Sequence, residues 1–304
     1  MFPLLRKDFK FIIDLKYFVP FPISRLVQRL IPINHMIRIN SSLGLATLTL
    51  FAVAASSQAA VLLSESFDYA AGSSFGLNGG TGFGGAYTGS GSITTPGQTF
   101  TDITSAGNKF TTVGNNSGAF RVLSAPIGTD AGVIFVRFLT SSATTTIPGY
   151  AGLSFFSSAT DPVTISEELF MGNTGSSDNY GFEVTDVGAV ATSIPVSNST
   201  TLLVYRLSFG TASDTIDLYV NPGSTLPGAP DATFTTPNNT AFPATFDRIR
   251  LQSGGGLDLF NFDEIQIATT AAEVLPIPEP GSIGLMVGSI ALLSFQRRRK
   301  EKRA

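Results

Sequence analysis

Neighbouring carboxylates are the first residues to test for chemistry, because cleavage of a glycosidic bond needs two of them facing one cleft. Such neighbours occur at Glu167-Glu168, at Asp214 with Asp217, and at Asp263-Glu264. In a strand the side chains alternate between two faces, so residues one or three positions apart point to opposite sides. The first pair also precedes an apolar stretch, which is typical of a solvated strand start. We therefore expect no catalysis from these pairs.

Histidine, cysteine and tryptophan are almost missing from the chain. His35 is the only histidine, and the 304 residues contain no Cys and no Trp. After residue 59 the chain therefore has no Ser-His or Cys-His nucleophile, no zinc site of the His or Cys type, and no disulfide. We expect no cofactor, and stability that comes from a hydrophobic core, for which about 200 residues are enough.

Loop aspartates are weak candidates for calcium ligands, because calcium prefers carboxylate and backbone oxygens. Three lie in or near expected loops: Asp178, Asp214 and Asp258. An aspartate in a loop more often serves a turn, so we assign no metal site. Four tyrosines could stack on a sugar ring in the absence of Trp: Tyr87, Tyr150, Tyr180 and Tyr219. Glycan binding, with or without calcium, is therefore the alternative function, and a glycoside hydrolase is less favoured.

Charge is segregated along the chain. Residues 1–59 carry seven basic and two acidic side chains, and six basic residues follow Phe295. Between residues 60 and 275, 6 Lys and Arg stand against 18 Asp and Glu, which gives a net charge of −12. Nucleic-acid phosphates bind clusters of Lys and Arg, so this acidic middle part is not expected to bind nucleic acid.

The segment 36–59 has the three parts of a secretory signal peptide. Arg38 makes the start positive, residues 43–55 are apolar, and small residues precede the expected cut between Ala59 and Ala60. This order of parts is what the export machinery reads. We therefore expect an exported protein whose mature chain begins at Ala60.

Residues 1–35 form an extension in front of this signal. They either lengthen its basic start or precede the true start codon at Met36, and we favour the second, since Met36 alone begins a complete signal. The rest of the chain divides into a domain at 60–272 and a tail at 273–304.

The tail has three parts in a fixed order. Pro278, Glu279 and Pro280 come first, and an apolar run at 281–295 follows. Proline fixes φ and lacks an N–H, so the tripeptide should stay extended, whereas the apolar run should form a transmembrane helix. A basic cluster then provides the cytoplasmic stop expected from the positive-inside rule; it contains Arg297, Arg298, Arg299 and Lys300.

This three-part order resembles the PEP-CTERM sorting signal of exported bacterial proteins. The resemblance covers about the last 30 residues. It implies a partner, the exosortase-type membrane transpeptidase, that recognises Pro278, Glu279 and Pro280 and cuts near them. The protein would then be anchored transiently in the inner membrane and afterwards reach the cell surface or the medium. A permanent tail anchor is the alternative.

The middle of the chain predicts an all-β fold. Short runs rich in β-branched and aromatic residues alternate with clusters of Gly, Ser, Asn and Pro, as in sandwiches and barrels. Within 214–220, for example, Ile216 and Leu218 share one face and Asp217 takes the other. The clearest strands are expected at 131–140, 150–157, 180–187, 201–210, 214–220, 246–253 and 259–268. We predict a two-sheet antiparallel β-sandwich.

The core of this sandwich is expected to contain Phe135, Phe155, Leu203, Tyr205, Leu218, Ile249, Leu251, Phe262 and Ile265. The segments LLSESFDYAAGS and FDRIRLQSGGG resemble exported bacterial proteins with a concanavalin A/laminin-G-like jelly roll. That resemblance implies that the first and last strands pair, Leu62–Phe67 beside Phe262–Ile267. The Gly-rich segment after the first strand is expected as an irregular loop with Phe83 and Tyr87 packed on the sandwich, or else as a mobile low-complexity segment.

These features together favour an exported, non-catalytic bacterial surface or extracellular-matrix protein. Its expected partners are the exosortase-type enzyme at the tail and an extracellular polysaccharide at the sandwich.

Overall fold

The computed structural model describes residues 60–276, apart from 106, 115–116, 129–131, 144–148, 159–166, 176, 237–244 and 257–258. The extension 1–35, the signal 36–59 and the motif, apolar run and basic cluster of the tail lie outside this part. Within it the long elements are strands, and α2 (Ala271–Val274) is a single helical turn. No helix in this part of the chain has the length and apolar character needed to cross a membrane.

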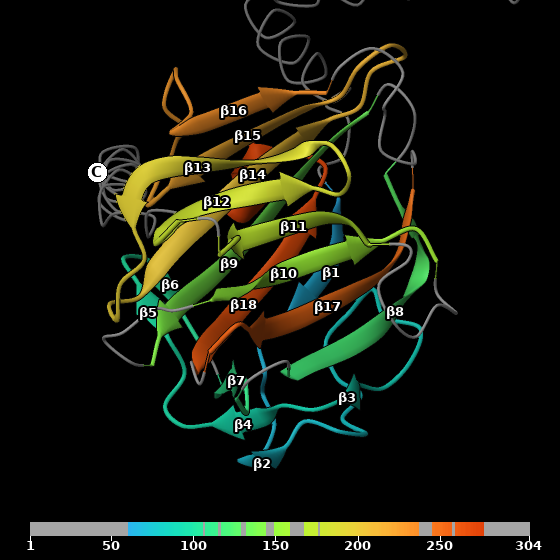
Figure 1. The fold of residues 1–304 in the computed structure, drawn as a ribbon. Coiled ribbons are helices and arrows are strands. Elements are labelled where there is room, and N and C mark those ends of the chain that lie inside the picture. The colour runs from blue at the N-terminus through green and yellow to red at the C-terminus, as the bar shows by residue number, and fades with distance from the viewer. Residues whose placement is uncertain are drawn as a thin grey trace, which may run out of the picture. The chain divides into compact units, whose positions relative to one another are not determined.

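The described residues form an antiparallel β-sandwich of two large sheets, which Figure 1 shows one in front of the other. The nine-stranded sheet has the order β16-β15-β14-β9-β18-β7-β4-β2, and β1 pairs with β18 beside this path. Its strands are β1 (Val61–Glu65), β2 (Gly72–Ser73), β4 (Ser92–Thr94), β7 (Lys109–Thr111), β9 (Val133–Ser142), β14 (Thr201–Ser208), β15 (Thr215–Val220), β16 (Ala232–Thr235) and β18 (Phe260–Ala268).

The seven-stranded sheet has the order β13-β12-β11-β10-β17-β8-β3. Its strands are β3 (Thr88–Gly89), β8 (Ser117–Ile127), β10 (Tyr150–Phe156), β11 (Glu167–Asn173), β12 (Asn179–Val184), β13 (Gly188–Pro195) and β17 (Phe246–Gly254). The all-β, two-sheet antiparallel prediction is therefore confirmed.

The main core lies between the two sheets and follows from alternation along each strand. In β15 the buried Ile216 and Leu218 face this core, while Asp217 faces away. The expected core residues that lie in it are Phe155, Leu203, Tyr205, Leu218, Ile249, Leu251, Phe262 and Ile265.

Phe135 was expected in this core, and that prediction is wrong. The inward positions of β9 are Ile134 and Val136, while Phe135 points to the other face and packs half-buried against a second cluster. All three of these neighbouring residues are apolar, so alternation of residue type could not decide which face of β9 is inside.

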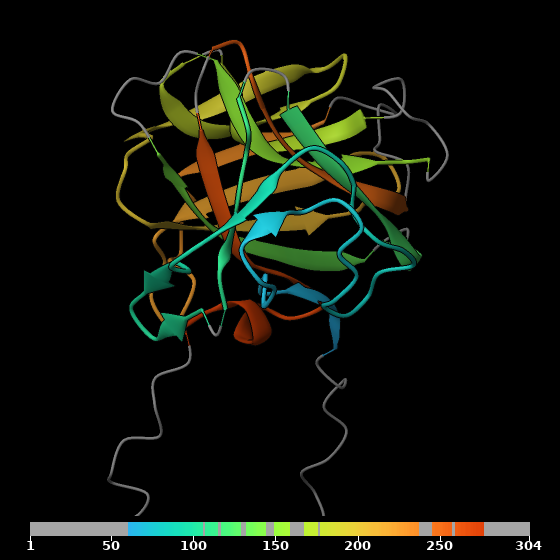
Figure 2. The ribbon, with the colours of Figure 1, turned by 90° about the horizontal axis from the view of Figure 1, so that it is seen from below.

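That second cluster covers part of the outer face of the nine-stranded sheet. Leu139 and Leu202 contribute from the sheet, Val274 comes from the segment of α2, and Ile103 comes from the hairpin β5 (Thr99–Phe100)–β6 (Ile103–Thr104). Figure 2 shows α2 and this hairpin on the same side of the sandwich. The sheet therefore has an apolar outer region that these two short elements shield from water.

The first and last strands pair as expected. β1 runs antiparallel to β18, with Leu63 opposite Ile267 and Glu65 opposite Ile265. This pairing places the two ends of the sandwich domain on adjacent strands of the nine-stranded sheet.

The Gly-rich segment after β1 packs on the sandwich as an irregular loop with short bridges. Tyr87 is buried in the main core, and Phe83 packs against it. Gly82 has φ +84°, and a Cβ there would lie 2.3 Å from the carbonyl oxygen of Leu62. The loop therefore passes too close to β1 for any residue but glycine.

Candidate functional site

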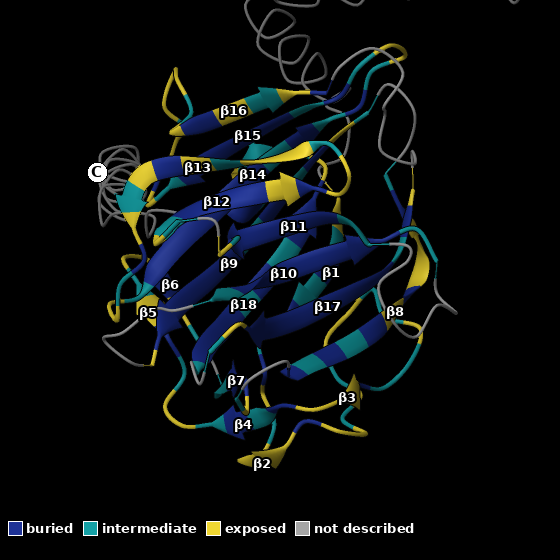
Figure 3. Cartoon of the chain, in the orientation of Figure 1, coloured by how far each residue is buried: buried dark blue, intermediate teal, exposed yellow. Residues whose placement is uncertain are grey.

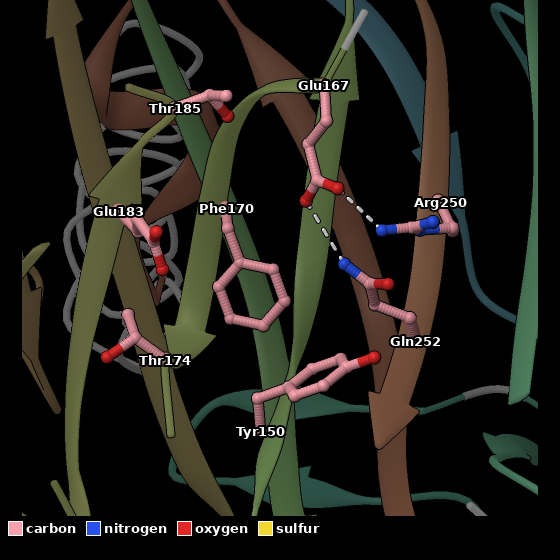
Figure 4. A pocket seen from close by; sticks show the side chains of 8 residues that line it. All are labelled: Tyr150, Glu167, Phe170, Thr174, Glu183, Thr185, Arg250 and Gln252. Carbon is pink, nitrogen blue, oxygen red and sulfur yellow. Dashed lines mark hydrogen bonds and ion pairs between the residues drawn. The ribbon is translucent and has the colours of Figure 1, made fainter. Parts of the chain in front are cut away.

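The outer face of the seven-stranded sheet carries a cavity of about 350 Å³. Strands β10, β11, β12 and β17 line it, and Figure 3 shows these strands buried along much of their length. Eight side chains surround the cavity in Figure 4: Tyr150, Glu167, Phe170, Thr174, Glu183, Thr185, Arg250 and Gln252.

Strand register places a row of glycines beside the cavity. Five residues lie opposite one another on five neighbouring strands of this sheet. In the order β8, β17, β10, β11 and β12, they are Gly118, Gln252, Gly152, Gly172 and Gly181. These positions face outward, because their neighbours along each strand face the core. A row with a single side chain therefore crosses five strands. Gln252 is the member of this row that lines the cavity, whereas a Cβ at Gly152, Gly172 or Gly181 would lie only 2.2–2.3 Å from a backbone oxygen of the neighbouring strand.

Aromatic rings stand on both sides of this glycine row. Phe170 lies one row away on β11, and Tyr150 lies on the opposite side of the row on β10. Their ring centroids are 5.9 Å apart at an interplanar angle of 81°, an edge-to-face contact. The ring of Phe170 leans over Gly152, where a Cβ would lie 2.7 Å from a ring carbon. The ring of Phe170 thus covers the row at Gly152, and the two rings together give the cavity an apolar side.

Hydrogen bonds fix the polar side of the cavity around Glu167. Arg250 Nη2 donates to Glu167 Oε2 over 2.6 Å, and Gln252 Nε2 donates to Glu167 Oε1 over 3.1 Å. The same Gln252 nitrogen lies 2.7 Å from Ser154 Oγ. The ionic side chains are only 10% and 15% exposed, so their geometry is held by the protein rather than by solvent.

Electrostatics in the cavity follow from burial and from this ion pair. Burial lowers the pKa of Arg250, and the neighbouring Glu167 carboxylate opposes that shift. Burial also raises the pKa of Glu183, and the negative charge of Glu167 raises it further. Figure 4 shows Glu183 and Glu167 on opposite sides of Phe170. The cavity therefore holds one carboxyl group that is paired with an arginine, Glu167, and a second one, Glu183, whose pKa is raised.

Two arginines that stack on the rings of Phe120 and Phe156 extend the site along the sheet. The guanidinium carbon of Arg248 lies 5.0 Å from the ring centroid of Phe120 and 4.7 Å from that of Phe156. The guanidinium carbon of Arg250 lies 5.3 and 5.1 Å from the same two centroids. Such cation–π contacts hold Arg250 in the orientation in which it meets Glu167.

The arrangement offers apolar ring faces beside fixed hydrogen-bonding groups. A molecule with a flat C–H face and a rim of hydroxyl groups matches both features. Because the polar groups already sit in place, little side-chain freedom is lost when such a molecule binds.

Of the four tyrosines considered for sugar stacking, Tyr150 lines the cavity. The rings of Tyr87 and Tyr180 are buried in the main core, and that of Tyr219 is buried in the second cluster. These three rings face packed protein, so the prediction that they could stack on a sugar is wrong.

Two of the three carboxylate pairs separate as alternation predicts, but the prediction that Asp263 and Glu264 point to opposite faces is wrong. A register shift between Asp263 and Gln266 interrupts alternation in β18, so that Asp263 meets Gln98 and Glu264 meets Arg137 on the same outer face of the nine-stranded sheet. Glu167 enters the cavity, whereas Glu168 accepts a hydrogen bond from the Ser157 hydroxyl. Asp217 is held by Arg206 on the outer face of the other sheet.

The calcium candidates are placed apart. Asp178 is exposed just before β12, and Asp214 is buried and accepts the backbone N–H of Gly210. Asp258 lies outside the described residues, as do the sorting motif Pro278–Pro280 and the Ala59 side of the signal cut. Among the described residues no group of three or more His, Cys, Asp or Glu is arranged to hold a metal ion.

Sequence reasoning missed Phe170, Glu183, Gln252 and the glycine row. The available signal was the presence of Gly152, Gly172 and Gly181 inside apolar strands, which marks places where a ligand or another backbone comes close.

These observations define the class of protein. It is an antiparallel β-sandwich whose seven-stranded sheet carries an open cavity bordered by aromatic rings. No protein-family model matches the sequence, and comparison with curated protein sequences gives no match either.

Among solved structures, the chain is similar to the globular domain of T. cruzi calreticulin, with 13% identity and a TM-score of 0.49 over 79% of this chain and 100% of that one. It is similar to lectin II from Ulex europaeus, with 12% identity and a TM-score of 0.43 over 69% and 100%. It is also similar to an endo-1,3-beta-glucanase from Streptomyces sioyaensis, with 10% identity and a TM-score of 0.46 over 70% and 97%.

Proposed function

We propose that this chain is an exported, non-catalytic surface or matrix protein whose sandwich, a concanavalin A-like jelly roll, binds carbohydrate on the seven-stranded sheet. The observation that carries the binding proposal is a single cavity in which the rings of Tyr150 and Phe170 lie beside the network of Glu167, Arg250 and Gln252.

Carbohydrate fits this cavity better than an apolar or a strongly charged ligand. A pyranose has a C–H face that stacks on aromatic rings and hydroxyl groups that need both donors and acceptors. The cavity supplies rings at Tyr150 and Phe170, donors at Gln252 and Arg250, and an acceptor at Glu183. Its volume of about 350 Å³ lies in the range of small-molecule sites.

Binding without catalysis is supported by the state of Glu167. Both of its oxygens already accept hydrogen bonds, from Arg250 and from Gln252. A hydrolase needs a proton-donating carboxylic acid and a second, reactive carboxylate. An ion-paired Glu167 is suited to orient Arg250 and Gln252 instead.

Export and sorting are supported by the sequence at both ends. The signal at 36–59 and the tail with Pro278, Glu279 and Pro280 are the basis for this part of the proposal. The proposed partner is an exosortase-type transpeptidase, and the proposed destination is the cell surface or the surrounding matrix.

A glycan array probed with the full-length chain tests the binding proposal. We expect a restricted set of oligosaccharides to bind, and to remain chemically intact after prolonged incubation. Release of shorter sugars would contradict the non-catalytic part. Absence of any hit over neutral and acidic glycans would contradict carbohydrate binding.

A further inference from the structure

A second set of polar side chains crosses the nine-stranded sheet on its outer face. Ser92, Thr111, Asn261 and Ser141 lie opposite one another on β4, β7, β18 and β9. They face away from the main core, because Phe110 and Phe262, their neighbours on β7 and β18, lie in it. The row is neutral, and it shares no residue with the first cavity.

Hydrogen bonds tie this row into a fixed chain. Thr111 Oγ1 donates to Asn261 Oδ1 over 2.9 Å, and Asn261 Nδ2 donates to Ser141 Oγ over 3.1 Å. The hydroxyl groups of Thr94 and Thr111 are 2.5 Å apart, so Thr94 is the donor when Thr111 donates to Asn261. Each side chain therefore has a defined donor and acceptor direction before any ligand arrives.

Gln98 completes the chain and leaves one polar atom without a partner. Its Nε2 donates to Ser141 Oγ over 2.9 Å, and its backbone N–H donates to Asp263 Oδ2 over 2.7 Å. The residue is only 5% exposed, yet its Oε1 atom has no hydrogen-bond partner among the described residues. Reversing the amide would leave Nε2 unpartnered instead. A buried polar group of this kind is costly unless something binds to it.

A cavity of about 580 Å³ lies at this place. Its lining includes four residues of the hydrogen-bonded chain and two neighbours: Gln98, Thr111, Ser141, Asn261, Asn198 and Thr200. None of the described lining residues is acidic. The basic residue Lys109 also lines it, and its Nζ already donates to the carbonyl oxygen of Pro96 over 2.8 Å. The described lining is therefore made of hydroxyl and amide groups rather than of aromatic rings or paired charges.

We propose that this cavity is a second binding site, and that it takes a neutral saccharide through hydrogen bonds alone. A sugar hydroxyl would accept from the O–H of Ser141, whose oxygen already accepts from Gln98 and Asn261, and would donate to Gln98 Oε1 after a rotation of the Gln98 side chain that exposes this buried atom. The site stands on residues separate from those of the first cavity, so it holds whether or not the first one binds carbohydrate. Two sites on opposite sheets would let one molecule bridge two polysaccharide chains.

Hydrogen–deuterium exchange of the full-length chain, with and without trehalose, cellobiose or maltose, tests this site directly. We expect at least one of these sugars to protect peptides that contain Gln98, Thr111 and Asn261. In the Gln98→Met variant, which keeps the size of the side chain, we expect the affinity measured from this protection to fall by about 10-fold or more. The matched change Gln252→Met at the first cavity should leave it unaltered.

Two further variants keep the proposal testable if Gln98→Met fails to fold. Thr200→Val at the rim should also weaken protection of the same peptides, while Lys109→Met should leave it within about twofold, because the ligand is neutral. The proposal is overturned if no sugar protects these peptides, in which case the cavity holds only solvent. It is equally overturned if glucuronate protects them better than the neutral sugars and Lys109→Met abolishes that protection.

Discussion

Arg121 and Glu65 form a buried ion pair, with Nη1 of the arginine 2.6 Å from Oε2 of the glutamate and both side chains 1% exposed. The pair connects β8 of one sheet to β1 of the other. Arg121 also donates to the carbonyl oxygens of Gly79 and Gly85, and its guanidinium carbon lies 3.6 Å from the ring centroid of Phe83. One side chain therefore fixes the Gly-rich loop on the sandwich.

Removing one partner of this pair should strongly destabilise the protein. Arg121→Met leaves the Glu65 carboxylate buried without its counter-charge, and such losses cost about 3–5 kcal/mol. Urea unfolding followed by circular dichroism measures the change in the free energy of unfolding. The double variant Arg121→Met with Glu65→Leu should be less destabilised than the single one, because no charge is left buried.

The pair of Arg206 with Asp217 provides the matched control. The side chain of Arg206 is 41% exposed, although that of its partner Asp217 is only 4% exposed and also accepts a hydrogen bond from Thr233. Arg206→Met should therefore cost less than Arg121→Met, because only one member of this pair is buried. Equal losses for Arg121→Met and Arg206→Met would show that burial of the first pair does not matter.

Variants of the first cavity should separate binding from folding. Tyr150→Ala removes a border ring and Gln252→Ala removes a donor, so each should lower the affinity for an array-identified glycan by about 10-fold or more. Isothermal titration calorimetry measures the affinity. Thr215→Ala, on an exposed part of the other sheet, is the control and should bind as the parent chain does. Unchanged affinity for both cavity variants would place the glycan elsewhere.

The glycine row should tolerate no side chain at its centre. Gly172 has φ +142°, and a Cβ there would lie 2.3 Å from the carbonyl oxygen of Ala151. Gly172→Ala should therefore destabilise the fold by about 1–3 kcal/mol. Gly223 has open space around its missing Cβ, so Gly223→Ala should stay within about 0.5 kcal/mol of the parent chain. Thermal unfolding compares the two, and a similar melting temperature for both would refute the steric argument.

Asp263 should make stability depend on pH near neutrality. Burial raises the pKa of its carboxyl group from 3.8 to about 7, although the backbone N–H groups of Gln98 and Glu264 oppose the shift. The folded protein then holds a proton that the unfolded chain releases above pH 3.8. This group's contribution to stability is therefore full below that pH and is lost as the pH rises through about 7.

The measurement is urea unfolding at a series of pH values from acidic to mildly alkaline. We expect the free energy of unfolding to decline between the two pKa values, and the decline to become shallower in Asp263→Asn, which cannot ionise. Asp231→Asn changes an exposed aspartate and is the control. If Asp263→Asn shows the same pH dependence as the parent chain, another group is responsible.

The sequence predicted the sandwich well because its strands alternate clearly. Ile216 and Leu218 against Asp217 gave the inner face of β15 without any structural information. Alternation failed at Phe135, since β9 is apolar on both faces where α2 and its neighbours cover the sheet.

The sites were harder to predict, because they depend on strand order and register. One row of glycines forms only after three strands align, and it consists of Gly152, Gly172 and Gly181. The ion pair of Glu65 and Arg121 joins residues that are 56 positions apart in the chain. No local pattern encodes either relationship.

The tail should act as a removable sorting device. We expect Pro278 and Pro280 to favour an extended segment, because proline fixes φ and cannot donate a backbone hydrogen bond. The apolar run at 281–295 contains no charge, and a charge at its centre would cost about 2.5–3.5 kcal/mol on insertion scales. The basic residues from Arg297 onward should resist crossing. The tripeptide should then be left at the outer membrane surface, within reach of a membrane-embedded enzyme.

Replacing Glu279 by Ala should leave export intact and cause a membrane-bound precursor to accumulate in a host with exosortase. Glu273→Ala, a nearby glutamate outside the motif, should be processed like the parent chain. Mass spectrometry of the mature surface protein measures both. A mature chain that still contains residues 283–295 would mean that the apolar run is a permanent anchor, because a segment cut near Glu279 cannot stay attached to the sandwich.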